Sequence, residues 1–371
     1  MKHSGISIFD VQELVDLVID FLASSRLDLY ATALVATSWV SRSQYHIFRD
    51  VQFDFARALD NGLAESLRAS SPFASTVRKA LVQLNYLHLE LFSDFDWVNL
   101  EEIIFMGASD VDESVELSCV PLVQKVLGFQ GLRRIHISGG FSSTNTLTKY
   151  FDNCSTRIQS LLLSARIPPT SKITEVPDEG SSCTGKIDLC HFGISLSCYR
   201  WITSPQCPFN ISRISSVDVW AFEWPLFARE LAPRLNRLRS LTLLDLAGSP
   251  IDVSMFPVLD TLHVWINAIS AGVPQLITTL SRLHAKNTLR RLTLSFWDNT
   301  FRHGDKLIQF DHAITTLSTV ESLTRVEIFS TPWLIARELE TVRPLFPNLA
   351  ANGRLFLVAS EGDLLTTVHV A

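Results

Sequence analysis

One glycine-rich segment has the spacing of a phosphate-binding loop. Gly180 and Gly185 enclose four residues, and Lys186 follows the second glycine. Such a loop follows a buried strand, and a Ser or Thr after the lysine holds magnesium. Here the acidic Glu179 precedes the loop and Ile187 follows the lysine. Because an acidic neighbour repels phosphate, we assign no nucleotide site to this segment.

A group of cysteines with one histidine has the residue types that bind zinc. The group comprises Cys183, Cys190, His191, Cys198 and Cys207. Zinc sites usually draw their ligands in pairs about two to four residues apart. The cysteines here are seven, eight and nine residues apart. We therefore expect free, mostly buried thiols, and we predict neither a metal nor a cofactor.

The common catalytic signatures are absent from the sequence. It contains no Gly-x-Ser-x-Gly, His-Glu-x-x-His or Gly-x-Gly-x-x-Gly motif. A Ser–His–Asp set would have to be assembled by the fold from distant residues. We therefore predict no catalytic residues and a protein that is not itself an enzyme. An enzyme whose site is assembled by loops remains an alternative, which a pocket of titratable residues would favour.

The composition limits the class of protein. Of 371 residues, 47% are hydrophobic and 19% charged, with a formal net charge of −6. These values are unlike those of disordered chains, and they do not indicate a nucleic-acid partner. No run of about 18 apolar residues predicts a membrane span, and acidic residues interrupt the first thirty positions, unlike in a signal peptide. We expect a soluble protein of the cytoplasm and/or nucleus, without a membrane partner.

The first fifty residues predict three short helices. Between positions 11 and 22, apolar residues recur with helical spacing at Val11, Leu14, Val15, Val18, Ile19 and Leu22. Asp10 and Glu13 resemble a capping box at the start of this helix. A second helix is expected from Asp28 and a third from Trp39 to Phe48. Three such helices bury little surface alone, so they form either a cap on a larger core or a docking module.

This segment resembles an F-box. The family pattern is Leu-Pro-x-Glu-Leu-Leu-x-x-Ile-Leu-x-x-Leu, followed by Asp-Leu and then Val-x-x-x-Trp. It matches this sequence at Glu13, Leu14, Val15, Val18, Ile19, Leu22, Asp28, Leu29, Val35 and Trp39. Two features depart from the family: Asp10-Val11 replaces the Leu-Pro opening, and Thr32 and Ala36 replace two frequent cysteines. The residues from Ser41 to Val51 are similar to the tail of many fungal F-boxes.

A second pattern recurs through the rest of the chain. Leu-x-x-Leu-x-Leu, with Ile, Val or Phe allowed, starts at Leu100, Leu132, Ile158, Ile214, Leu238, Leu259, Leu289 and Leu323. The starts are 21 to 34 residues apart except for one gap of 56, in which Ile187-x-Leu189 is a degenerate copy. Val77 begins a leading copy, and Leu355-x-Leu357 trails. Each copy predicts a short strand with one apolar face, and the residues between copies return the chain to the next parallel strand.

These repeats resemble leucine-rich repeats over about residues 77 to 360. The family's turn asparagine occurs in register only at Asn267, so a regular horseshoe is not expected. The predicted fold is α/β: a three-helix F-box-like module (1–52), a connecting helix (53–76) and an irregular leucine-rich-repeat-like solenoid with a parallel sheet (77–371). An ordinary α/β domain with similarly spaced strands is the alternative. The turn-rich segment 164–186 is either a functional loop or a plain insertion.

The pattern also predicts which side chains face a partner. Residues between the apolar strand positions point to the opposite face, and this substrate-facing set includes His136, Asp218, Thr242, His263, Thr293 and Glu327. They are mixed polar residues, which favours a protein partner over nucleic acid. Residues 81–124 hold nine acidic residues and no Lys or Arg, whereas residues 200–243 hold six arginines and three acids. This uneven charge is either ordinary solvated surface or a means of steering an acidic partner.

The F-box resemblance implies a role in ubiquitin transfer. It implies docking onto the adaptor subunit of an SCF-type ubiquitin ligase and, through it, association with a cullin. The implied adaptor-binding residues are Leu14, Val15, Val18, Ile19, Leu22, Leu29, Val35 and Trp39. The repeats would hold a substrate protein, whose identity the sequence does not reveal. A scaffold or regulator outside any ligase, with the same fold, is the alternative.

Overall fold

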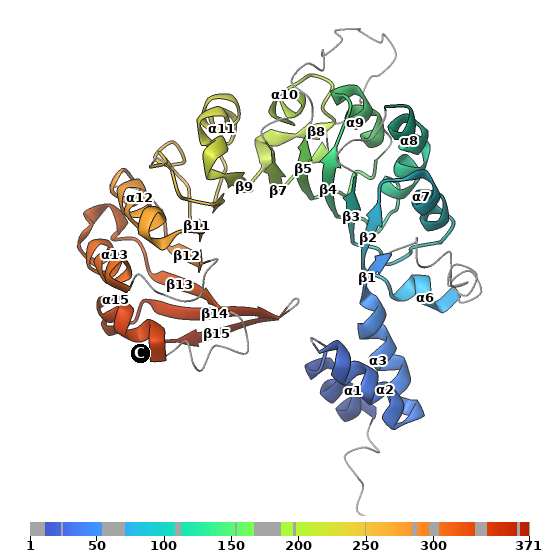
Figure 1. Cartoon of the computed structure of the whole chain (residues 1–371), viewed down its shortest axis with the longest axis horizontal. Coiled ribbons are helices and arrows are strands. Elements are labelled where there is room, and N and C mark those ends of the chain that lie inside the picture. The colour runs from blue at the N-terminus through green and yellow to red at the C-terminus, as the bar shows by residue number, and fades with distance from the viewer. Residues whose placement is uncertain are drawn as a thin grey trace, which may run out of the picture. The chain divides into compact units, whose positions relative to one another are not determined.

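The computed structural model shows an α/β protein (Figure 1). It describes residues 12–23, 25–53, 71–107, 113–152, 154–166, 187–195, 198–248, 250–283, 288–296, 304–330, 340–361 and 364–370. Three N-terminal helices precede a series of mostly parallel strands that alternate with helices. The chain divides into two compact units, Met1–Gly140 with Lys149–Arg157, and Phe141–Thr148 with Ile158–Ala371.

The first unit begins with the three predicted helices, α1 (Gln12–Phe21), α2 (Arg26–Val35) and α3 (Thr37–Arg49). Ser25 caps α2 by accepting a hydrogen bond from the amide of Asp28 at 3.4 Å. The proposed capping residue of α1, Asp10, lies outside the described residues. Strand β1 (Asp50–Phe53) follows α3 without an intervening residue. The third helix therefore continues directly into the sheet, a strand that the sequence pattern did not predict.

Four parallel strands form the sheet of the first unit, in the order β1, β2, β3, β4. The bounds are Lys79–Gln83 for β2, Glu102–Met106 for β3 and Arg134–Gly140 for β4. Helix α6 (Ser71–Thr76) precedes β2, while α7 (Tyr86–Ser93) and α8 (Glu113–Leu127) connect β2 to β3 and β3 to β4. Parallel neighbours require such crossover connections. Most of the predicted connecting helix, residues 54–70, lies outside the described residues.

Two glycines bring β4 and the end of β3 unusually close. The Gly107 amide donates to the Ser138 carbonyl oxygen at 2.6 Å. Gly139 has a φ of 126°, and a Cβ there would lie 2.6 Å from the Gly107 Cα. A side chain at Gly139 would therefore strain the backbone and collide with the neighbouring strand.

In the second unit, nine strands follow one another in the order β5, β7, β9, β10, β11, β12, β13, β14, β15. The bounds are Ser160–Arg166 (β5), His191–Ile194 (β7), Ser216–Trp220 (β9), Ser240–Leu244 (β10), Thr261–Ile266 (β11), Arg291–Phe296 (β12), Arg325–Ser330 (β13), Leu355–Glu361 (β14) and Leu364–His369 (β15). All of these neighbours are parallel except β15, which runs antiparallel to β14. A separate pair, β6 (Ile187–Asp188) and β8 (Phe209–Asn210), is also parallel.

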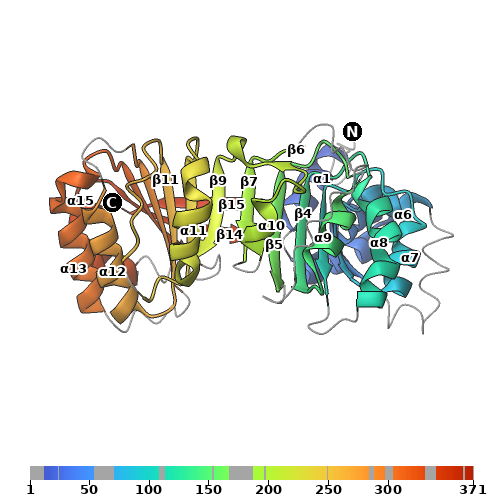
Figure 2. The same cartoon turned by 90° about the horizontal axis from the view of Figure 1, so that it is seen from above.

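Helices cover one face of the second unit's strands, as Figures 1 and 2 show. They are α10 (Tyr199–Ile202), α11 (Trp224–Glu230), α12 (Ile269–Ser281), α13 (Gly304–Thr316) and α15 (Pro347–Ala351). A row of apolar side chains beneath them runs through Leu161, Phe192, Val217, Leu241, Leu262, Leu292 and Val326, all buried. The alternate residues point to the opposite face, on which no helix of the described residues lies. We call this the open face.

The predicted strands are confirmed at all eight repeat copies, and at the leading and trailing ones. One prediction is wrong: Ile187-x-Leu189 is not the copy inside the long gap, because β6 pairs with β8. The strand that fills the gap is β7, where Phe192 takes the buried position in register with Leu161. The apolar pair was misleading because Leu189 is buried just before β7. The insertion 167–186, including the glycine-rich segment and Cys183, lies outside the described residues.

Candidate protein-docking surfaces

The three N-terminal helices share a small apolar interior. Val15, Ile19, Leu29 and Ile47 are buried in it, and Leu22, Trp39 and Phe48 pack against it. Three of the predicted adaptor-binding residues, Val15, Ile19 and Leu29, are thus 0 to 2% exposed and hold the helices together. They do not present a surface to a partner in this structure. The spacing could not reveal this, because apolar residues occupy more than one side of α1.

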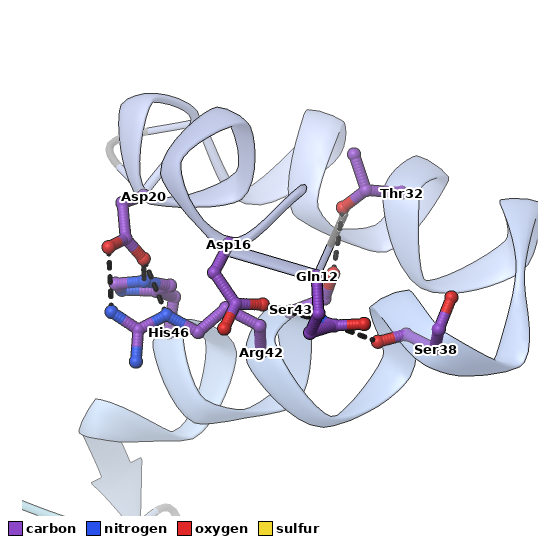
Figure 3. A network of polar contacts seen from close by, with 8 residues as sticks. All are labelled: Gln12, Asp16, Asp20, Thr32, Ser38, Arg42, Ser43 and His46. Atoms are coloured by element: carbon purple, nitrogen blue, oxygen red, sulfur yellow. Dashed lines mark hydrogen bonds and ion pairs between the residues drawn. The ribbon is translucent and has the colours of Figure 1, made fainter. Parts of the chain in front are cut away.

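An ion-pair network joins α1 to α3 (Figure 3). The guanidinium of Arg42 donates to both oxygens of Asp20, at 2.6 and 2.7 Å, and His46 Nε2 lies 2.7 Å from Oδ1. Hydrogen bonding from Arg42 lowers the pKa of Asp20, although its partial burial acts in the opposite direction. The same contact raises the pKa of Arg42. The bidentate pair fixes how α1 lies on α3.

Further hydrogen bonds link both α1 and α2 to α3 (Figure 3). The hydroxyls of Thr32 on α2 and Ser43 on α3 lie 2.9 Å apart and are buried. Gln12 Nε2 donates to Asp16 at 2.7 Å and to the carbonyl oxygen of Ser38 at 3.3 Å. Thr32, one of the two departures from the family's cysteines, therefore has a structural role between α2 and α3.

The outer sides of α1 and α2 expose large apolar side chains. On α1 these are Leu14, Leu17, Val18 and Phe21, and on α2 they are Leu27, Tyr30, Leu34 and Val35, with exposed fractions from 38% to 88%. We call them the apolar stripes, because each set recurs at helical spacing. Single exposed apolar residues are ordinary, but so many on two short helices mark an interaction surface. Leu14, Val18 and Val35 are the predicted adaptor-binding residues that belong to this surface.

On the open face of the second unit, five of the predicted substrate-facing residues form one row. Backbone register joins Asp218 to Thr242, Thr242 to His263, His263 to Thr293, and Thr293 to Glu327. We call this the polar row. Neighbouring strands are about 4.8 Å apart, so adjacent members can contact one another. The alternation in the sequence predicted this row correctly.

The sixth predicted residue, His136, belongs to the first unit. It lies on β4 in register with Ile104 of β3. Burial lowers its pKa, and Lys79 acts in the same direction, whereas Glu102 opposes the shift. Lys79 and Arg134 both form ion pairs with Glu102, at 2.8 Å each.

A histidine that the sequence analysis considered only as a zinc ligand contacts the end of the polar row. His191 on β7 places Nδ1 2.9 Å from Ser160 Oγ and Nε2 3.1 Å from Asp218 Oδ2. Burial raises the pKa of Asp218, but hydrogen bonds and charge from His191, with help from Thr242 and His263, outweigh this effect, and the net shift is downward. Correct placement of β7 would have put His191 on the open face, because it directly precedes the buried Phe192 and is registered with Ser216.

These contacts resemble a Ser–His–Asp set in composition and in hydrogen-bond connectivity. A nucleophilic serine also needs free donors that stabilise an oxyanion. Ser160 and His191 lie opposite each other in the parallel ladder between β5 and β7. The amides of Cys190 and His191 already donate to the Gln159 carbonyl oxygen, at 2.8 and 3.1 Å. The arrangement therefore serves cross-strand pairing better than it serves acyl transfer.

At the other end of the polar row, Glu327 is 6% exposed and collects several donors. Thr293 Oγ1 donates to its Oε2 at 2.8 Å, and the guanidinium groups of Arg291 and Arg325 lie 3.7 and 2.5 Å from Oε1. Arg325 also stacks over the Phe356 ring, 4.3 Å from its centroid. This buried carboxylate is therefore compensated by charge and by hydrogen bonds.

Aromatic side chains lie one step further along the same strands. Trp220 and Trp265 follow Asp218 and His263 by two residues and so point to the same face. Trp220 is 40% exposed and lies 5.8 Å from the Phe222 ring, which is 69% exposed. The Trp265 ring lies 5.6 Å from His263. The alternation rule could have found both tryptophans had it been extended by two positions.

The remaining site types have no counterpart in the described part of the chain. Among those residues no cluster of three or more His, Cys, Asp or Glu side chains could hold a metal ion. Cys119, Cys154, Cys190, Cys198 and Cys207 are free thiols, as expected, although Cys190 is exposed. Within the described residues, no helix has the length and hydrophobicity needed to span a membrane.

Comparison with known proteins identifies no family. No protein-family model matches the chain, and no curated protein matches it.

Proposed function

We propose that this protein is the substrate-recruiting subunit of an SCF-type ubiquitin ligase. The observation that carries the proposal is the pair of apolar stripes on α1 and α2. They lie within the segment whose sequence resembles an F-box, and their exposed side chains have the character of an interface core. In this proposal the apolar stripes bind the adaptor subunit, which links the protein to a cullin.

The interior and the surface of the helical module have separate roles in this proposal. Val15, Ile19 and Leu29 form the interior, whereas Leu14, Val18 and Val35 contact the adaptor. Leu22 and Trp39, half-buried against the interior, contribute mainly to its stability. The Asp20–Arg42 pair keeps α1 in a fixed position on α3, which lowers the entropy cost of docking.

The strands after the module form an irregular leucine-rich-repeat-like solenoid in this proposal. Its supports are the parallel strands of both units and the recurring buried row of the second. The open face, with its polar row and the exposed Trp220, is the surface for a substrate protein. The protein is then not itself an enzyme. It raises the effective concentration of the substrate beside the ubiquitin-charged enzyme of the cytoplasm or nucleus.

Co-purification tests this function. The tagged full chain, expressed in cells, is expected to retain both the SCF adaptor and a cullin. Depletion of the adaptor should release the cullin, because the adaptor is the only link between the two. If the tagged chain retains neither protein, or retains the cullin after the adaptor is depleted, the proposal is wrong.

One departure from the family favours a second function. The Leu-Pro opening of the F-box pattern is Asp10-Val11 here, which removes a rigid turn next to the first helix. A scaffold outside any ligase needs no such turn. In that case the apolar stripes would bind another helical protein, and co-purification would recover that protein without the adaptor.

A further inference from the structure

Arginines gather where the second unit's strands begin. The strands β10, β12, β13 and β14 carry, at or next to their first residues, Arg239, Arg290, Arg291, Arg325 and Arg354, and we call these five the arginine edge. Arg291 is registered with Arg325. Leu355 is registered with Val326, so the preceding residue, Arg354, lies opposite Arg325. These three arginines therefore lie side by side on consecutive strands.

The other two arginines form an adjoining row. The Asp260 amide donates to the Arg239 carbonyl oxygen, and the Arg290 amide donates to the Asp260 carbonyl oxygen, each at 2.8 Å. Asp260 thus lies between the two arginines on successive strands. With about 4.8 Å between strands, the backbones of Arg239 and Arg290 are about 10 Å apart, close to the Debye length at physiological salt. The charges of the arginine edge therefore act together.

The carboxylates present are too few for these arginines. Arg291 and Arg325 share the single carboxylate of Glu327. Arg290 is 73% exposed and lies 3.8 Å from Asp260. In the described part of the chain, the side chains of Arg239 and Arg354 form no ion pair or hydrogen bond, and neither does that of Arg237, which is exposed two residues earlier. The arginine edge thus has uncompensated positive charge in a chain whose net charge is −6.

Several arginines outside the edge are paired one to one. Arg42, Arg78 and Arg213 each form an ion pair with a separate carboxylate, at 2.6, 2.7 and 2.8 Å. A row of unpaired like charges on neighbouring strands is unfavourable in the free protein. A partner that brings carboxylates relieves this repulsion, because guanidinium groups bind carboxylates in a bidentate, charge-assisted manner.

We propose that the arginine edge binds an acidic peptide segment, rich in Asp and Glu, of the substrate protein. This assignment rests on the proposed function, because that function makes the bound protein a substrate. A peptide fits better than a nucleic acid, because the two rows of the edge contain no aromatic residue on which bases could stack.

The test measures binding of a fluorescent polyglutamate peptide to the full chain by anisotropy, with a polyglutamine peptide for comparison. We expect binding of polyglutamate alone at about 50 mM salt and weaker binding at about 200 mM. Arg239→Glu with Arg290→Glu changes two exposed members of the arginine edge and should weaken binding about tenfold or more, because each reversal replaces an attraction by a repulsion. The matched control, Arg200→Glu with Arg229→Glu, makes the same change of charge on exposed residues of α10 and α11. It should weaken binding less than about twofold.

Three results would overturn the inference. The first is that polyglutamate does not bind at low salt, and the second is that the two double variants lose equal affinity for it. The third is that a single-stranded oligonucleotide binds more tightly than polyglutamate and that the edge variant abolishes this binding. The adaptor assay is independent, since the adaptor contacts α1 and α2 in the proposal. A chain that binds the adaptor but not polyglutamate contradicts this inference alone, and one that binds polyglutamate but not the adaptor contradicts the proposed function alone.

Discussion

Thr293 donates a hydrogen bond of 2.8 Å to Glu327 on the neighbouring strand, and both side chains are buried on the open face. Glu327 also faces Arg291 and Arg325. Replacement of Glu327 by Ala leaves a buried hydroxyl and two arginines without their acceptor. We expect it to lower the free energy of unfolding by about 2–4 kcal/mol, as measured by urea denaturation. Glu321→Ala removes an exposed carboxylate six positions earlier in the chain and should cost less than about 0.5 kcal/mol; equal costs would contradict this account of the polar row.

The pair between Asp20 and Arg42 allows a double-mutant cycle. Both side chains are about one-third exposed, so we expect a coupling energy of only about 0.5–1 kcal/mol for Asp20→Asn and Arg42→Gln. Thermal unfolding of the four proteins measures it. A coupling energy of zero within error would show that the pair does not hold α1 on α3.

The pKa of His263 predicts how stability depends on pH. Burial lowers this pKa below its ordinary 6.5, although the carboxylates of Asp218 and Glu327 act in the opposite direction. A histidine with a lowered pKa contributes stability above the unfolded-state value, and this contribution is lost as the pH falls through the lowered pKa. The wild type should therefore lose stability on acidification from about pH 7.5 to 5.5. The variant His263→Asn should lose less stability over the same range, since position 263 then holds no titratable group.

The control for the pH experiment is a histidine on the helix side of the same unit. His312 on α13 is exposed, so His312→Asn should keep the wild-type dependence on pH. Urea denaturation at both pH values, for all three proteins, gives the comparison. The role assigned to burial would be contradicted if the free energy of unfolding of His263→Asn depended on pH as steeply as that of the wild type.

The buried leucines of the repeat predict large costs of truncation. Leu161, Leu241, Leu262 and Leu292 are 0% exposed and occupy the same row beneath the helices. Each Leu→Ala variant should lose about 2–5 kcal/mol of unfolding free energy. Thr242→Ala, on the opposite face of β10, should lose less than any of them. Costs within about 0.5 kcal/mol at all four leucines would mean that the row is not a core.

The strands were predictable because their signal is local. An apolar residue at every second position fixes the buried face of a strand, and recurrence of the pattern predicted the parallel neighbours from β9 to β13. Among the strands that the pattern did not predict, β7 and β15 escaped for clear physical reasons. In β7, Gly193 stands in the polar row and weakens the alternation, while β15 is defined by its antiparallel pairing with β14 rather than by a repeat.

The candidate sites were predictable only in part. Position within the repeat identified Asp218 and His263, but not their partners, because the contact of His191 with Asp218 joins residues 27 positions apart. For the helical module, spacing alone could not separate the buried Ile19 from the exposed Val18, since both are apolar and adjacent. Only the packing of α1 on α3 decides which of the two remains free for a partner.

The most direct test of the central claim is the affinity of the full chain for the purified SCF adaptor, measured by calorimetry. Leu14→Asp with Val18→Asp places two charges in an apolar stripe, whereas the control, Ser41→Asp with Gln44→Asp, adds the same charges to exposed polar positions on α3. Circular dichroism of each variant verifies that it is folded. We predict that the stripe variant binds at least about 30-fold more weakly than the wild type, and that the control binds like the wild type. A folded stripe variant with wild-type affinity, or a wild type that does not bind the adaptor, would contradict the account.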